Sequence, residues 1–177
     1  MLFSDRSISA MVHGMAFGGT ALMALTAAWF LLWTLSADDR AHVATRRQSR
    51  AVAWLTSFVA GVLWLSVLSG TYVVFPPYRA TPPAGVTDLS AYPRALILAS
   101  PDTAWLHAFA METKEHVPWI AAMLATAVAF VSTRDRSVFL DDRRIRGGAM
   151  VLVGVCLALV AYVGLLGVLV NKVAPLE

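Results

Sequence analysis

The sequence predicts an all-α fold, an integral membrane four-helix bundle that forms a single domain over residues 1–177. Its composition is 58% hydrophobic and 14% charged, with a mean hydropathy of +0.67, which is unusual for a soluble domain. The apolar residues gather in four runs, at about 10–35, 51–75, 103–131 and 147–170. Each run is long enough to cross a hydrocarbon core of about 30 Å, which takes about 20 helical residues.

The first run, 10–35, is expected to be a retained span rather than a cleaved signal peptide. At about 25 residues it is longer than the apolar core of a signal sequence. Its leading segment places Asp5 beside Arg6, and no small-residue cleavage pattern follows Leu35.

The second and fourth runs are predicted to be scaffold, because both are rich in small residues that let helices approach closely. The second run also carries no charged residue and no histidine. The small residues are Ser57, Ala60, Gly61, Ser66, Ser69 and Gly70 in the second run, and Gly147, Gly148, Gly154, Ala158, Ala161, Gly164 and Gly167 in the fourth.

The single cysteine, Cys156, lies in the fourth run and is expected to be a packing residue. One cysteine permits no disulfide within the chain. It also excludes a covalent c-type haem and a cysteine-bound iron–sulfur cluster for this chain alone, since no CxxCH motif is present.

Nine of the fourteen basic residues fall in the two connections that follow the first and third runs. Cytoplasmic loops of membrane proteins carry such an excess of positive charge. We therefore expect a multi-pass protein of the cytoplasmic (inner) membrane, with both termini outside and no nucleic-acid partner. The residues concerned are Arg40, Arg46, Arg47 and Arg50, with His42 beside them, and Arg134, Arg136, Arg143, Arg144 and Arg146.

The connection 76–102 is then external, and it contains six of the eight prolines. Proline favours extended, pre-ordered backbone over helix. The apolar segment Ala95–Ala99 within it is expected either to lie on the membrane surface or dock a partner, or to cap the outer end of the bundle.

The third run, 103–131, is polar in its first half, where it carries His107, Glu112, Lys114, Glu115, His116 and Pro118. Ionisable residues inside a membrane usually face a protein interior, a cofactor or a wet cavity. At 100° per residue, Glu112, His116 and Trp119 share one face, whereas His107 and Lys114 lie on the opposite side. The two histidines are therefore not expected to bind one metal ion together.

His13 in the first run is the candidate partner, because the predicted topology places it at the level of His107 and His116. Gly14 and Gly18 follow it, and a porphyrin between helices needs an axial imidazole beside a wall without bulky side chains. We predict a two-histidine site of His13 with His116 or with His107. His116 is preferred because Trp119 shares its face, and Glu112 would orient its ring.

These segments, VHGMAFGG (12–19) and HAFAMETKEHVPW (107–119), resemble the histidine-bearing helices of small membrane b-type cytochrome subunits. The resemblance implies one haem b with His13 and His116, or His107, as axial ligands. It also implies an electron-transfer subunit with no catalytic residues of its own. Such a subunit would act between the quinone pool and an external carrier such as cytochrome c, together with other membrane subunits of a respiratory or photosynthetic complex.

Two other functions remain open from the sequence. The chain is alternatively a cofactor-free structural or assembly subunit of a membrane complex. The third hypothesis is a proton or ion pathway that uses Glu112, Glu115 and His116.

Overall fold

The computed structural model describes residues 4–35 and 42–174, with side chains from residue 47 onward in the second range. Arg40 and the side chains of His42 and Arg46 therefore lie outside the described residues. The described chain is helical and contains no strand, which confirms the all-α prediction. Four of its helices are long and apolar enough to cross a membrane: Asp5–Thr34, Arg47–Arg79, Pro101–Arg134 and Arg143–Val173.

Three of these four long helices contain a π-helical segment (η). The first consists of α1 (Asp5–Met11), η1 (Val12–Gly19) and α2 (Thr20–Thr34). The second consists of α3 (His42–Ser69), η2 (Gly70–Val74) and α4 (Phe75–Arg79). After α5 (Pro93–Leu98), the third consists of α6 (Pro101–Trp105), η3 (Leu106–Met111) and α7 (Glu112–Arg134). The short α8 (Val138–Asp141) precedes the fourth, α9 (Arg143–Val173).

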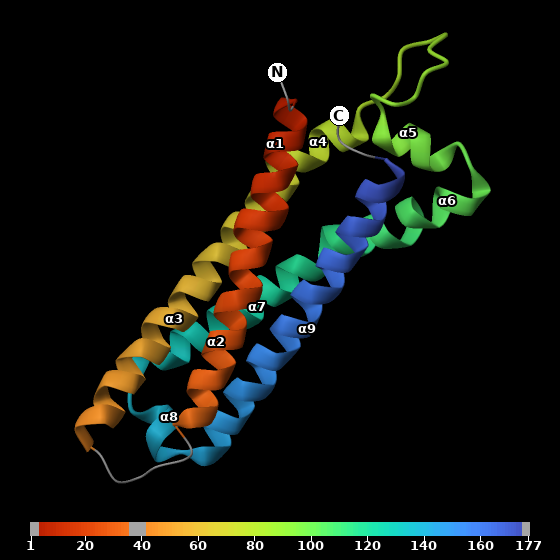
Figure 1. Cartoon of the computed structure of the whole chain (residues 1–177). Helices are drawn as coiled ribbons and strands as arrows, with labels where there is room; N and C mark the ends of the chain where they lie inside the picture. The colour runs from red at the N-terminus through yellow and green to blue at the C-terminus, as the bar shows by residue number, and fades with distance from the viewer. Residues whose placement is uncertain (1–3, 36–41, 175–177) are drawn as a thin grey trace.

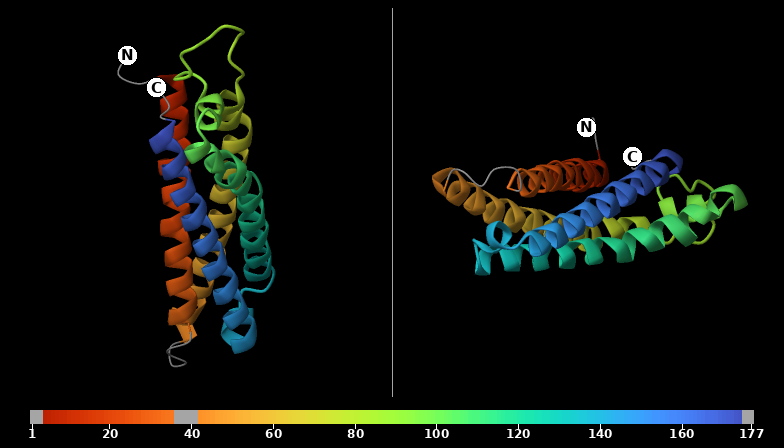
Figure 2. Two further views of the ribbon diagram at one scale, coloured as in Figure 1. Left: turned by 90° about the vertical axis from the view of Figure 1, so that its right-hand side faces the viewer. Right: turned by 90° about the horizontal axis from the view of Figure 1, so that it is seen from below.

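The four long helices run alternately up and down, with α2 and α7 each packed against both α3 and α9 (Figures 1 and 2). The beginning of α1, the end of α9 and helices α4, α5 and α6 gather at one end, which we call the terminal end. The opposite end carries α8 and is called the α8 end (Figure 1).

The long helices extend beyond the predicted spans, with 30, 33, 34 and 31 residues. The predicted loop 76–102 is shorter, because several of its prolines lie inside helices. Pro76 and Pro77 are in the first turn of α4, while Pro93 and Pro101 begin α5 and α6. Proline is accepted there because the first helical turn needs no N–H donor.

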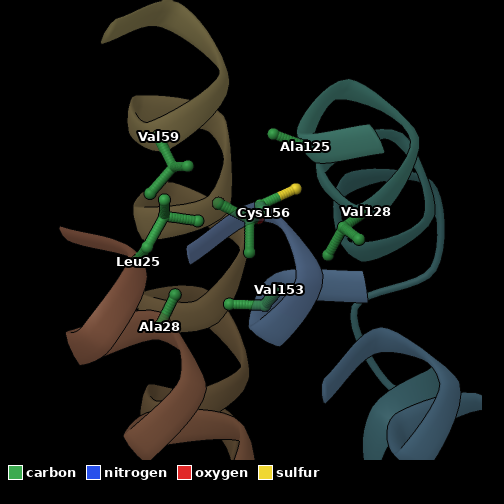
Figure 3. Close-up of a pocket in the computed structure, with 8 residues that line it drawn as sticks. Leu25, Ala28, Val59, Ala125, Val128, Val153 and Cys156 are labelled. Carbon is green, nitrogen blue, oxygen red and sulfur yellow. The ribbon is translucent and has the colours of Figure 1, made fainter. Parts of the chain in front are cut away.

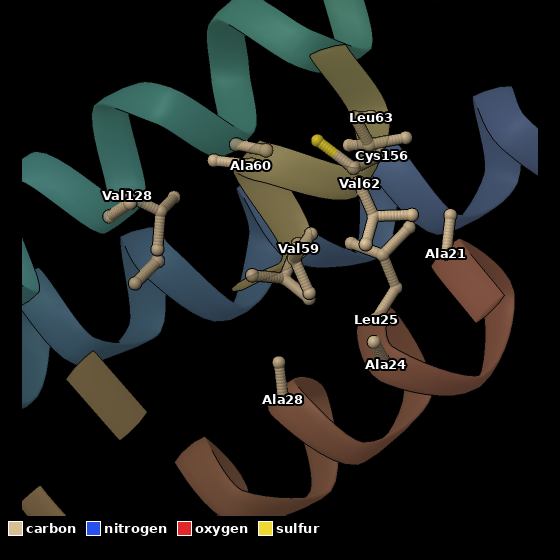
Figure 4. Packing of buried hydrophobic residues seen from close by; sticks show 14 of the residues in the cluster. Ala21, Ala24, Leu25, Ala28, Val59, Ala60, Val62, Leu63, Val128 and Cys156 are labelled. Atoms are coloured by element: carbon tan, nitrogen blue, oxygen red, sulfur yellow. The ribbon is translucent and has the colours of Figure 1, made fainter. Parts of the chain in front are cut away.

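The main core fills the bundle towards the α8 end and consists largely of alanine and valine (Figure 4). Val59 of α3 points towards Ala28 of α2, while Ala60 of α3 points towards α7, so the helices approach closely without large side chains between them.

Cys156 is fully buried in this core, as predicted for a packing residue. A void of only about 10 Å³ lies beside it, lined in part by Leu25, Val128 and Val153 (Figure 3). That is room for one water molecule at most.

A second core cluster lies at the terminal end and is closed by α5. Ile97 is fully buried against Leu106, Met111 and Leu166. The hydroxyl of Thr103 donates to the Ile97 carbonyl at 2.7 Å and ties α5 to α6. The segment Ala95–Ala99 was expected either to lie on the membrane surface or dock a partner, or to cap the end of the bundle. The structure supports the cap.

Candidate functional site

A layer of polar and titratable side chains separates the two apolar core clusters. Along the third long helix, Met111 belongs to the terminal cluster and Trp119 packs against the main one, whereas Lys114 and Glu115 belong to neither. Along the second, Val67 belongs to the main cluster and Tyr78 to the terminal one. Ser69 and Gly70 lie between these two, and they face His13 of the first helix.

His13 is seated against the second long helix in a place that only a glycine provides. A Cβ built on Gly70 would lie 2.8 Å from Cε1 of the imidazole, well inside van der Waals contact. Nδ1 of His13 lies 3.1 Å from Ser69 Oγ. The Ser69 hydroxyl lies 3.1 Å from the Ser66 carbonyl, and when it donates there its oxygen accepts from Nδ1–H of His13. In that tautomer of the neutral ring, the lone pair of Nε2 is available to a ligand or a proton.

Lys114 enters the same layer from the third long helix and ends against the fourth. A Cβ on Gly167 would lie 2.7 Å from its ammonium nitrogen. The charge of Lys114 acts on the His13 ring, which places the two basic groups within electrostatic range. No acidic side chain among the described residues is hydrogen-bonded to this ammonium group, and the Lys114 side chain is half-buried.

His107 faces Tyr78 on the same side of the third helix as Lys114. The Tyr78 hydroxyl lies 3.0 Å from His107 Nδ1, and the tyrosine is only 4% exposed. Four charged groups act electrostatically on the Tyr78 hydroxyl, those of Arg94, Glu115, Glu112 and Arg79. Either partner can donate in the Tyr78–His107 bond, so the bond is compatible with both tautomers of His107.

Two buried polar atoms of this region have no hydrogen-bond partner in the described chain, Oε1 of Glu115 and Nε of Arg94. Buried polar atoms are nearly always satisfied in folded proteins. An unsatisfied, buried carboxylate oxygen is therefore a site where a proton or a water would bind.

His116 and Glu112, by contrast, are exposed on the outer side of the third helix. Nδ1 of His116 donates to the backbone carbonyl of Glu112 at 2.7 Å, so the carbonyl orients this ring and the Glu112 carboxylate does not. Trp119 packs edge to face on Trp64 of α3, with ring centroids 5.7 Å apart. The structure thus keeps the predicted separation between the two faces and places the His107–Lys114 face inside.

Gly14 and Gly18, the glycines predicted to form a bare wall beside His13, face open space. A Cβ on Gly14 would meet nothing within 4 Å, and one on Gly18 would meet only the His13 backbone oxygen at 3.7 Å. The glycines that shape the layer are Gly70 and Gly167, which sequence reasoning assigned to scaffold. No local signal distinguishes them, because their partners are set by the register between helices.

All three π-helical segments occur at the terminal end, and His13 and His107 each lie inside one. π-Helical turns are rare and often mark functional sites, because the wider turn redirects side chains. Among the described residues no group of three or more His, Cys, Asp or Glu could hold a metal ion.

The fold and the site define a bundle of four long apolar helices with a titratable layer near one end. Comparisons with protein-family models, with curated proteins and with solved structures found no match. The function is therefore inferred from the residues of the titratable layer.

Proposed function

We propose that the chain is a multi-pass subunit of the cytoplasmic membrane, with both termini outside, that holds one haem b and transfers electrons. Its partners are other membrane subunits, the quinone pool and an external carrier. The observation that carries this proposal is the His13 ring, which is fixed by Ser69 with Nε2 unengaged in a niche at Gly70.

The donor chemistry fits haem. A histidine ligand normally donates its other ring N–H to an acceptor, which fixes the tautomer and raises the basicity of the ligating nitrogen. Ser69 is such an acceptor for His13. Bound haem b would supply one-electron chemistry. The Lys114 cation, within electrostatic range of His13, would favour the reduced state of the haem.

We assign the second ligand to His107 in preference to His116. His107 is half-buried on the inner side and has Tyr78 beside its Nδ1, whereas His116 is exposed. In this assignment Tyr78 accepts from the His107 Nδ1–H, which leaves Nε2 for ligation.

A reduced-minus-oxidised absorption spectrum of the purified full chain tests this proposal. We expect a low-spin haem b signature that is lost in His13→Ala and in His107→Ala. His116→Ala is the matched control and should retain the signature. A spectrum without haem would overturn the cytochrome function in favour of an assembly subunit. Loss in His13→Ala and His116→Ala, with the signature retained in His107→Ala, would instead make His13–His116 the ligand pair.

A second candidate is a proton pathway, favoured by the unpartnered Oε1 of Glu115 in the layer with Lys114 and near Tyr78. Buried carboxylates of this kind serve as proton relays in membrane proteins. Proton flux into liposomes should then fall in Glu115→Gln and persist in Glu112→Gln, whose carboxylate is exposed. Equal flux in both variants would exclude this function.

A further inference from the structure

A second site is present at the α8 end, far along the bundle from the titratable layer. It is a cavity of about 390 Å³ between α3 and the end of α7, lined by Arg50, Ala53, Trp54, Ser57, Thr133 and Arg136. The four α3 residues follow the spacing of one helical face. The volume falls in the usual range for small-molecule sites, about 300–1,000 Å³.

The hydrogen-bonding groups of this cavity select for an anion. The Ser57 hydroxyl donates to Ala53 O at 2.7 Å and that of Thr133 to Ala129 O at 2.8 Å, so neither has a proton left to donate. The remaining donors are the guanidinium groups of Arg50 and Arg136 and the indole N–H of Trp54.

Both arginines are exposed, and no described residue accepts a hydrogen bond from either. Two planar forks of this kind suit the oxygens of a phosphate group.

The nearest acidic residue in the sequence is Asp135, which directly precedes Arg136 and forms no ion pair with it. Its Oδ1 accepts from both the backbone N–H and the hydroxyl of Ser137, each at 3.0 Å. Among the described residues no acidic side chain lines the cavity.

The surroundings of the cavity indicate that the phosphate belongs to a lipid. Trp54 is 79% exposed, and an exposed stripe continues along α3 from it through Phe58, Gly61 and Leu65. Tryptophan is typical of the membrane interface, and basic pockets on the cytoplasmic side of helix bundles bind anionic headgroups. A free phosphate ion would make no use of the apolar stripe, whereas acyl chains would lie along it.

We propose that this cavity binds the headgroup of an anionic phospholipid, with Arg50 and Arg136 on the phosphate and the acyl chains along α3. The proposal rests on insertion of the bundle in a membrane with the α8 end at the cytoplasmic face. It is independent of haem.

Calorimetric titration of the purified full chain in neutral detergent tests the proposal, with dihexanoyl phosphatidylglycerol as the probe. Each arginine should contribute about fivefold in affinity, so Arg50→Gln with Arg136→Gln should weaken binding about 25-fold. The matched control is Arg134→Gln with Arg144→Gln, which removes the same charge from exposed residues of the same end outside the cavity. Its affinity should stay within about twofold of the wild type.

Three results would overturn the proposal. Equal weakening in both variant pairs would show that bulk charge, and not this cavity, attracts the lipid. Equally tight binding of dihexanoyl phosphatidylcholine would remove the selectivity for anionic lipid, and equally tight binding of inorganic phosphate would make the ligand a soluble anion.

If the double variant Arg50→Gln with Arg136→Gln does not express as folded protein, Arg50→Lys with Arg136→Lys is used instead. It keeps the charge and removes the planar guanidinium groups. Weaker binding than in the wild type supports the cavity, and unchanged affinity contradicts it.

Discussion

The absence of a side chain at Gly70 decides how His13 lies. A methyl group there would meet the imidazole at 2.8 Å, and a ring held between Ser69 and a helix backbone has little room to withdraw. The neighbouring Ser69 supplies the acceptor that sets the tautomer. Gly70 and Ser69 of the second long helix therefore determine the position of the His13 ring on the first.

We predict that Gly70→Ala destabilises the protein by about 1–3 kcal/mol, because the added methyl group overpacks the interface. Thermal unfolding in detergent measures this effect. Gly14→Ala is the matched control and should cost less than about 0.5 kcal/mol, since a Cβ there meets nothing within 4 Å. Adding His13→Ala to Gly70→Ala should remove most of the penalty, and a penalty unchanged in the double variant would contradict the proposed contact.

Lys114 is half-buried in the polar layer and has no acidic hydrogen-bond partner among the described residues. Lys114→Met keeps the length of the side chain and removes the charge. We expect it to raise the free energy of unfolding by about 1–3 kcal/mol, as replacements of buried charges often do. If haem is bound, the same variant should lower its reduction potential, because a nearby cation favours the added electron.

Lys172→Met is the control for this prediction, because Lys172 is exposed near the end of α9 and should leave both quantities unchanged. A fall in stability of Lys114→Met would mean that the ammonium group has a compensating partner.

At the level of the elements, the sequence predicted what depends on local composition. Four long apolar runs predicted four helices, and the structure contains them. The separation of His107 and Lys114 from His116 also followed from helical periodicity. The contacts made by these residues could not be predicted from periodicity. They depend on the register between helices and on π-helical turns that depart from 100° per residue. Gly70 and Gly167 were for that reason taken as general packing residues.

The short helix α5 shows how a segment of six residues completes the terminal end. Ile97→Ala should cost about 2–5 kcal/mol, because it leaves a cavity among Leu106, Met111 and Leu166. Leu98→Ala provides the comparison, since Leu98 is 46% exposed and its loss should cost less than about 0.5 kcal/mol. Thermal unfolding of both variants measures the difference, and similar costs would show that α5 does not close the core.

For the whole molecule, the fold gathers the described arginine-rich segments at one end. The beginning of α3, the end of α7 and the beginning of α9 lie at the α8 end, while the beginning of α1, the end of α9 and the loop between α4 and α5 lie at the opposite end (Figures 1 and 2). If the α8 end is cytoplasmic, as the positive charge predicts, the titratable layer lies towards the outer face and the arginine cavity at the inner one.

Labelling of introduced cysteines in intact cells tests this orientation. The native Cys156 is fully buried and should not react, so the wild type serves as the blank. Thr87→Cys lies in the exposed loop between α4 and α5, and Ser137→Cys lies in the exposed turn before α8. A membrane-impermeant maleimide should label Thr87→Cys in intact cells and Ser137→Cys only after the membrane is opened. The reverse pattern would show the opposite orientation in the membrane, with the titratable layer towards the cytoplasm.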